Sequence, residues 1–193
     1  SYLEQELSGE NIDVSVYRNL IASAKKHKST IHKFITLRKQ TLGLADMRYS
    51  DLYAGVSKSE ATYTFDDSAK LLIDATKIFG SEYTKNITIG LKPDSWIDKY
   101  PAKAKNSGAY CNGALADVHP YVLLNHLDNY DSASTLAHEM GHAMHSFFSN
   151  KYQPRETASY STFIAEIASI LNELLFAKHI IEKKDTEATE QIA

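Results

Sequence analysis

The sequence holds few of the residues that build a cross-linked extracellular domain. It has a single cysteine, Cys111, among 193 residues, so no internal disulfide framework is available. A chain of this kind fits a reducing compartment, and we therefore expect a cytoplasmic location. We interpret Cys111 as a half-buried strand residue rather than as a nucleophile.

The chain also lacks an excess of positive charge and an uninterrupted apolar run long enough to span a membrane. Lys and Arg number 21 against 24 Asp and Glu, which gives a formal net charge of −3 and no basic surface for nucleic acid. The most apolar stretch, Phe163 to Ile181, contains several polar residues and so predicts a buried helix rather than a membrane span. These residues are Glu166, Asn172, Glu173, Lys178 and His179. We therefore expect neither nucleic acid nor a membrane as a partner.

Most of the sequence before residue 80 has helical character. Apolar residues recur at helical spacing in Asn11 to Lys28, in Ile31 to Leu44 and in Thr64 to Phe79. Arg48 to Lys58, between the second and third of these stretches, predicts a turn-rich connection. Because 43% of the 193 residues are hydrophobic, the chain can bury a core of its own, and we predict a single domain over residues 1–193.

From Ile87 onward, Gly and Pro residues divide the sequence into short runs that favour a small sheet. The candidate strands are Trp96 to Asp98, Ala109 to Asn112 and Tyr121 to Leu124, and we expect them to pair antiparallel. Such a sheet among helices gives a mainly α (α+β) fold. An open strand edge can bind an extended peptide, so Gly108, Ala109 and Tyr110 are candidate substrate-binding residues. The alternative is a hairpin that only closes the core.

The stretch Thr135 to His145 carries the chemistry, because it contains H-E-x-x-H at helical spacing. Residues four apart lie on one face of a helix, so His138 and His142 present two imidazoles to one metal ion, most naturally zinc. Glu139 can reach a metal-bound water without being a ligand, as a general base requires. An apolar stripe on the other side predicts a helix with a buried back, formed by Ala133, Ala137, Met140, Met144 and Phe147. The alternative is a pair of surface histidines.

A catalytic zinc site usually takes a third protein ligand and leaves the fourth position to water. Glu166 is the natural candidate, because a carboxylate within an apolar helical stretch is costly to bury unless it is paired or binds a metal. Glu173 lies two turns further on and could accept the outer N–H of a ligating histidine, which would fix the tautomer of that ring. The alternatives are a core-edge pairing of Glu166 with Arg155 or a lysine, and a solvated Glu173.

Three segments of the chain resemble oligoendopeptidase F, in the thimet oligopeptidase family of zinc peptidases. They are H-E-M-G-H-A-M-H from His138, F-x-x-E-x-x-S around Glu166, and G-A-Y from Gly108. The resemblance implies a zincin-like helical domain with one Zn²⁺ on His138, His142 and Glu166, with Glu139 as general base. It also implies short peptides as substrates, which no local spacing here encodes.

Members of that family are longer, so we expect this chain to be a fragment that carries the zinc site. The side chains that stabilise the transition state would then lie outside it, and neither Tyr110 nor Tyr160 is assigned that role. We expect the isolated chain to be poorly active, and to self-associate or bind the missing remainder of its parent chain.

The sequence thus predicts a zinc metalloendopeptidase. Two alternatives remain open: another H-E-x-x-H peptidase, such as a carboxypeptidase, and a non-catalytic helical module with a structural zinc. The second needs a fourth protein ligand, for which His145 and His179 are the candidates.

Overall fold

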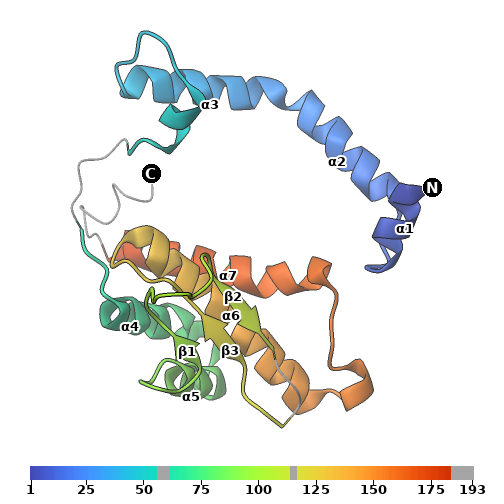
Figure 1. Ribbon diagram of the computed structural model, residues 1–193, viewed down its shortest axis with the longest axis vertical. Helices are drawn as coiled ribbons and strands as arrows, with labels where there is room; N and C mark the ends of the chain where they lie inside the picture. The colour runs from blue at the N-terminus through green and yellow to red at the C-terminus, as the bar shows by residue number, and fades with distance from the viewer. Residues whose placement is uncertain (56–60, 114–116, 184–193) are drawn as a thin grey trace. The chain divides into compact units, whose positions relative to one another are not determined.

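The computed structural model describes residues 1–55, 61–113 and 117–183 (Figure 1). The chain divides into two compact units, Ser1–Lys58 and Ser59–Ala193. The single domain expected over residues 1–193 stays a prediction. Within the described residues, no helix is both long enough and apolar enough to cross a membrane.

The first unit is helical. It comprises α1 (Tyr2–Ser8), α2 (Val14–Lys26), α3 (Lys28–Thr41) and the short 3-10 helix η1 (Tyr49–Tyr53). The side chain of Asp13 caps α2 by accepting a hydrogen bond from the backbone N–H of Ser15 at 2.7 Å. The two predicted long helices are present, and α1 was not predicted. Of the predicted turn-rich connection, residues 56–58 lie outside the described part.

The second unit contains the site. Its helices are α4 (Phe65–Ala75), η2 (Thr76–Phe79), α5 (Ser81–Gly90), α6 (Tyr130–Tyr152), η3 (Arg155–Thr157) and α7 (Thr162–Glu182). Helices α6 and α7 pack along one another, and α4 contacts both. The core between these elements buries Leu72, Ile87, Leu136, Met140 and Phe176 completely. Burial of these side chains supplies the main stabilising term of the unit.

A sheet of three short strands lies next to α6. The strands are β1 (Ile97–Asp98), β2 (Tyr110–Asn112) and β3 (Tyr121–Leu123), in the order β1-β3-β2. Each begins and ends within one residue of its prediction. The mainly α fold with a small sheet is confirmed, but the sheet is mixed rather than wholly antiparallel. β2 pairs antiparallel with β3, whereas β1 pairs parallel, because the long connection through β2 lets β3 enter beside β1 in the same direction.

Helix α6 has the buried back that its sequence predicts. Ala133, Ala137, Met140 and Met144 are at most 1% exposed, whereas Phe147 is only half-buried. The N-terminus of α6 is capped by Asn129, whose side chain accepts the backbone N–H of Ser132 at 2.9 Å. This cap fixes where the helix begins.

Helix α7 is buried on one face only. Ser169, Asn172, Phe176 and Ile180 are buried, so the prediction of a buried helix holds for this face. Seven large apolar side chains of α7 remain 42% to 65% exposed: Phe163, Ile164, Ile167, Ile170, Leu171, Leu174 and Ile181. The other described elements of this unit therefore cover only part of the apolar surface of α7.

Candidate metal centre

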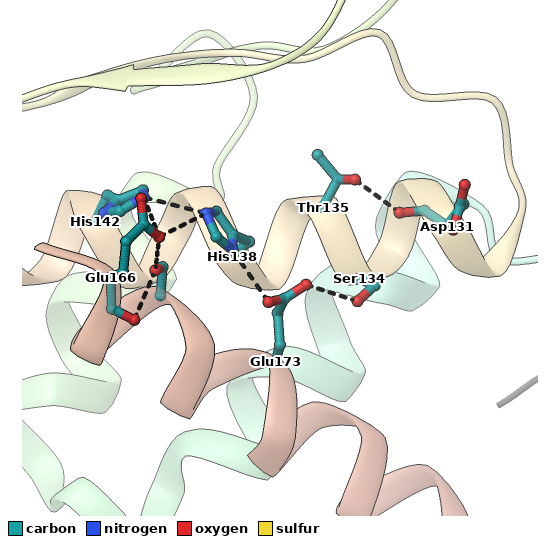
Figure 2. A network of polar contacts seen from close by, with 8 residues as sticks. Asp131, Ser134, Thr135, His138, His142, Glu166 and Glu173 are labelled. Carbon is teal, nitrogen blue, oxygen red and sulfur yellow. Dashed lines mark hydrogen bonds and ion pairs between the residues drawn. The ribbon is translucent and has the colours of Figure 1, made fainter. Parts of the chain in front are cut away.

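Helix α6 brings two imidazoles together. His138 and His142 are one helical turn apart, and their Nε2 atoms lie 3.1 Å from each other (Figure 2). Burial lowers the pKa of His142 and so favours the neutral ring, whose nitrogen lone pair can bind a metal. Two nearby groups act on this pKa in opposite directions: Glu166 raises it by favouring the protonated ring, and His138 lowers it.

Helix α7 brings a carboxylate to the same point. Oε2 of Glu166 lies 3.4 Å from Nε2 of His138 and 3.6 Å from Nε2 of His142 (Figure 2). These three side chains offer ligand atoms that all lie within 4.8 Å of one another, and the described residues contain no second group of this kind. Two imidazole nitrogens and one carboxylate oxygen form a donor set that suits zinc. The chemistry of the cluster therefore fits the expected metal.

Gly141 allows the two helices to approach closely enough for this arrangement. A Cβ atom on Gly141 would lie 2.6 Å from Cα of Ser169 and 2.7 Å from the carbonyl oxygen of Ala168, both in the backbone of α7. Ser169 is fully buried at this crossing, and its hydroxyl donates a hydrogen bond to Oε2 of Glu166 at 2.8 Å. The crossing thus places Glu166 and orients its carboxylate.

Glu173 contacts the outer nitrogen of His138. Its Oε2 lies 3.1 Å from Nδ1, and its Oε1 accepts a hydrogen bond from the hydroxyl of Ser134 at 3.2 Å (Figure 2). A carboxylate in this position favours the tautomer with the proton on Nδ1, which leaves the Nε2 lone pair directed at Glu166 and His142. The contact has the expected geometry, and the effect of Glu173 on metal binding stays a prediction.

Glu139 follows the first histidine and is 6% exposed. No hydrogen-bond partner of its Oε2 atom is found in the part of the chain that the structure describes. Burial raises the pKa of this carboxyl group; His138 opposes the effect, while the charges of Glu166 and Glu173 add to it. A carboxylate with a raised pKa is a better proton acceptor near neutral pH, as a general base requires.

A cavity of about 480 Å³ joins these residues to the edge strand. α6 contributes His138, Glu139, His142 and Ser146. Tyr160 comes from the segment that leads into α7, and Thr162 and Glu166 come from α7 itself. Tyr110 and Cys111 of strand β2, with Ala109 just before it, form another wall. The alternative pairing of Glu166 with Arg155 or a lysine is not among the ion pairs of the described residues, in which Glu166 faces His138 and His142.

Two of the three predicted substrate-binding residues line this cavity. Ala109 and Tyr110 do so, whereas Gly108 lines a neighbouring cavity of about 240 Å³ with Asn125. Asn125 Nδ2 donates a hydrogen bond to the carbonyl of Gly108 at 2.8 Å, which anchors the start of the strand. Cys111 is half-buried in β2, and burial raises the pKa of its thiol to about 12. A thiol of this kind is a poor nucleophile, in agreement with its expected role.

Neither proposed fourth ligand belongs to the metal cluster found in the described residues. The ring of His145 stacks on Tyr160 instead, with centroids 3.8 Å apart. His179 lies two turns beyond the region of α7 that faces the site. The sequence argument gave no role to Ser134, Ser146, Tyr160 or Ser169, because single hydroxyl side chains carry no spacing signal of their own.

Comparison with known proteins gives a consistent result. The pattern of peptidase family M3 matches residues 1–192. Oligopeptidase PepF of Bacillus subtilis is 35% identical over 185 residues, which are 95% of this chain and 27% of that protein. An oligoendopeptidase F homolog of Borreliella burgdorferi is 36% identical over 181 residues, 93% of this chain and 30% of the relative.

Solved structures agree with the sequence comparison. A crystal structure from Chlamydophila abortus, described as that of a candidate peptidase, superposes with a TM-score of 0.80 at 40% identity and covers 98% of this chain and 32% of that one. PZ peptidase A with an inhibitor gives a TM-score of 0.75 at 18% identity, which supports the fold alone. The chain thus spans about 27% to 34% of the length of these proteins.

Proposed function

Because the chain belongs to peptidase family M3, we propose that it carries the metal centre of a zinc-dependent endopeptidase that hydrolyses short peptides. The observation that carries this proposal is the convergence of His138, His142 and Glu166 beside a buried Glu139, in a cavity bounded by an edge strand. Relatives are named oligopeptidase or oligoendopeptidase, and the restriction to short peptides is taken from those names.

The three convergent side chains would hold the metal. A bound Zn²⁺ supplies Lewis acidity, which lowers the pKa of water to about 7 and polarises a carbonyl group. Three ligands from the described residues, with neither His145 nor His179 among them, suit a catalytic site with an open position better than a closed structural site. Glu173 would keep His138 in the tautomer that presents Nε2 to the centre.

In this mechanism, Glu139 moves the protons. Its carboxylate accepts a proton from the attacking water and delivers it to the nitrogen of the leaving amine. The raised pKa of the group suits both steps, because it makes the carboxylate easier to protonate near neutral pH. Ala109 and Tyr110, at the start of the β2 edge, would hold the peptide backbone in an extended conformation beside the base.

A matched pair of variants tests the proposal. The chain is reconstituted with zinc at neutral pH, freed of excess metal and examined by elemental analysis. We expect about one equivalent of zinc in the unsubstituted chain and in Glu139→Gln, and a large loss of zinc in His142→Ala, since only His142→Ala removes a ligand. Less than about half an equivalent of zinc in the unsubstituted chain, or an undiminished amount in His142→Ala, would contradict the assignment of this metal site.

Turnover is measured with a quenched-fluorescence peptide blocked at both ends, in the complete natural protein that carries this sequence. Glu139→Gln should lower kcat on the order of 10²-fold or more, because general-base catalysis typically contributes about 10² to 10⁴. Cleavage of a doubly blocked peptide supports an endopeptidase, whereas a carboxypeptidase needs a free C-terminus. A near-normal kcat in Glu139→Gln would remove the base from its assigned role.

A further inference from the structure

A pair of hydroxyl groups lies on the wall of the metal-site cavity, and the mechanism above does not use it. Ser146 comes from α6 and Tyr160 from the segment between η3 and α7, and their hydroxyls share one hydrogen bond. Both side chains line the same cavity as Glu139 and Glu166. The pair therefore faces whatever molecule occupies that cavity.

Neighbouring groups hold this hydroxyl pair in place. The ring of Tyr160 stacks on the ring of His145 with centroids 3.8 Å apart and an interplanar angle of 15°. Ser146 is 6% exposed, and Gly113 packs so closely against it that a Cβ atom there would lie 2.5 Å from its hydroxyl oxygen. Two rings in van der Waals contact and one buried serine leave the phenol little freedom.

The pair has one hydrogen to donate. Two hydroxyls carry two hydrogens, and their shared bond uses one of them. Within the described residues, neither side chain makes a second hydrogen bond. Ser146 is buried while Tyr160 is only half-buried, so the arrangement that offers the remaining hydrogen to the cavity is the one in which Ser146 donates to Tyr160. A phenol that accepts one hydrogen bond becomes a stronger donor in the next.

The position of the pair along the cavity indicates which part of a ligand it would meet. Ser146 lies four residues beyond His142, a rise of about 6 Å along α6. Strand β2 runs beside this helix, because Cys111 lines the same cavity as Glu139. Just past the strand, Gly113 lies against Ser146, and its carbonyl accepts a hydrogen bond from Nδ2 of Asn150 at 3.1 Å. Two residues of an extended peptide span about 6.5 Å. A peptide beside β2 would thus reach the pair about two residues from the metal ligands.

Building on the proposed peptidase function, we propose that Tyr160 contacts the substrate. Its hydroxyl, oriented by Ser146, donates a hydrogen bond to a backbone carbonyl oxygen of the bound peptide, about two residues from the bond that is cleaved. A contact to backbone carries no preference for a particular side chain. It does require that the substrate extend at least that far along the cavity.

The test measures binding of uncleaved peptides by the zinc-loaded complete natural protein that carries this sequence, in a Glu139→Gln background. One ligand is a doubly blocked peptide, and the others are analogues in which one peptide group at a time is replaced by a trans-alkene of the same shape. The variants are Tyr160→Phe and, as a matched control, Tyr152→Phe. Tyr152, the last residue of α6, is also a hydroxyl donor, but its hydroxyl donates to Glu82 and it does not line the cavity.

We expect Tyr160→Phe to weaken binding of the parent peptide about five- to tenfold, the usual net effect of one neutral hydrogen bond. The same substitution should not weaken binding of the one analogue that already lacks the contacted carbonyl. Tyr152→Phe should leave every affinity unchanged, and zinc content should be equal in all variants. Ser146→Ala, which keeps the phenol, should show the same dependence on that peptide group with a smaller loss.

An equal loss for the parent peptide and all analogues would assign Tyr160 a merely structural role, and no loss at all would remove it from the binding site. Either result overturns this inference and leaves the proposed function standing. If the zinc-loaded complete protein binds no blocked peptide, the peptide assignment itself is wrong, and the inference is lost with it.

Discussion

Substitution of Gly141 by alanine tests whether the close crossing of α6 and α7 positions the metal ligands. The new Cβ would meet Cα of Ser169 at 2.6 Å, about 0.8 Å short of the 3.4 Å at which ordinary contact begins. The neighbouring atoms belong to the backbone of α7, so no side-chain rotation relieves the overlap. The two helices must therefore separate.

The expected loss of stability follows from two opposing effects. Overpacking of this kind typically costs about 1 to 3 kcal/mol, and the better helix propensity of alanine offsets about 1 kcal/mol. The free energy of unfolding of the metal-free chain should therefore fall by no more than about 2 kcal/mol. Metal affinity should fall as well, because Glu166 moves with α7 while both histidines stay on α6.

A shift of about 0.8 Å is large compared with the tolerance of about 0.2 Å in metal–ligand distances. We expect the zinc dissociation constant to rise at least about tenfold, the lower end of the losses seen when supports of a metal site are removed. Affinity is measured by competition with a chromogenic chelator, and stability by circular-dichroism melts without metal.

Gly9→Ala is the matched control for this experiment. Gly9 has helical backbone angles of φ −60° and ψ −30°, and no atom lies within 4 Å of a Cβ built on it. Its substitution should leave zinc affinity unchanged. If Gly141→Ala bound zinc as tightly as the parent chain and melted at the same temperature, the crossing would have no role in placing Glu166.

Three further expectations concern other parts of the second unit. Glu173→Gln should weaken zinc binding about 10- to 100-fold in the same chelator assay, and an unchanged affinity would return Glu173 to the role of a solvated carboxylate. Ala109→Pro should raise KM in the complete protein at equal metal content, because it alters the strand edge. A thermal melt excludes misfolding, and unaltered kinetics would count against a role of that edge in substrate binding. Burial lowers the pKa of His126 despite the opposing Asp128. The unfolded chain then binds protons more readily than the folded chain, so the urea midpoint should stay constant above about pH 6.5 and decrease as the pH falls below that value. In His126→Phe the midpoint should depend less steeply on pH, and an unchanged dependence would contradict this reasoning.

The sequence predicted the ligand-bearing helices well, because their signals are local. Spacing alone places His138 beside His142, and the cost of burying a lone carboxylate directs attention to Glu166. The structure brings the three side chains together as the sequence suggests. The metal itself, the base and the substrate-binding edge stay predictions, as do the cytoplasmic location and the expected partners.

Helix α5 illustrates what sequence reasoning missed. Its residues include Thr84, Asn86 and Thr88, whose side chains bond to backbone carbonyls four residues earlier and compete with helical structure. The helix forms because packing overrides that weak propensity, since Ile87 is completely buried. Likewise, the parallel pairing of β1 depends on a crossover whose path no local pattern encodes.

The division of ligands between two helices has a consequence for the connection that joins them. His142 lies on α6 and Glu166 on α7, and the chain between them passes through η3. A metal bound to both would close this stretch into a loop, as a covalent cross-link does, and would lower the entropy of the open chain. Zinc should then protect the residues around η3 from proteolysis, even though none of them touches the metal.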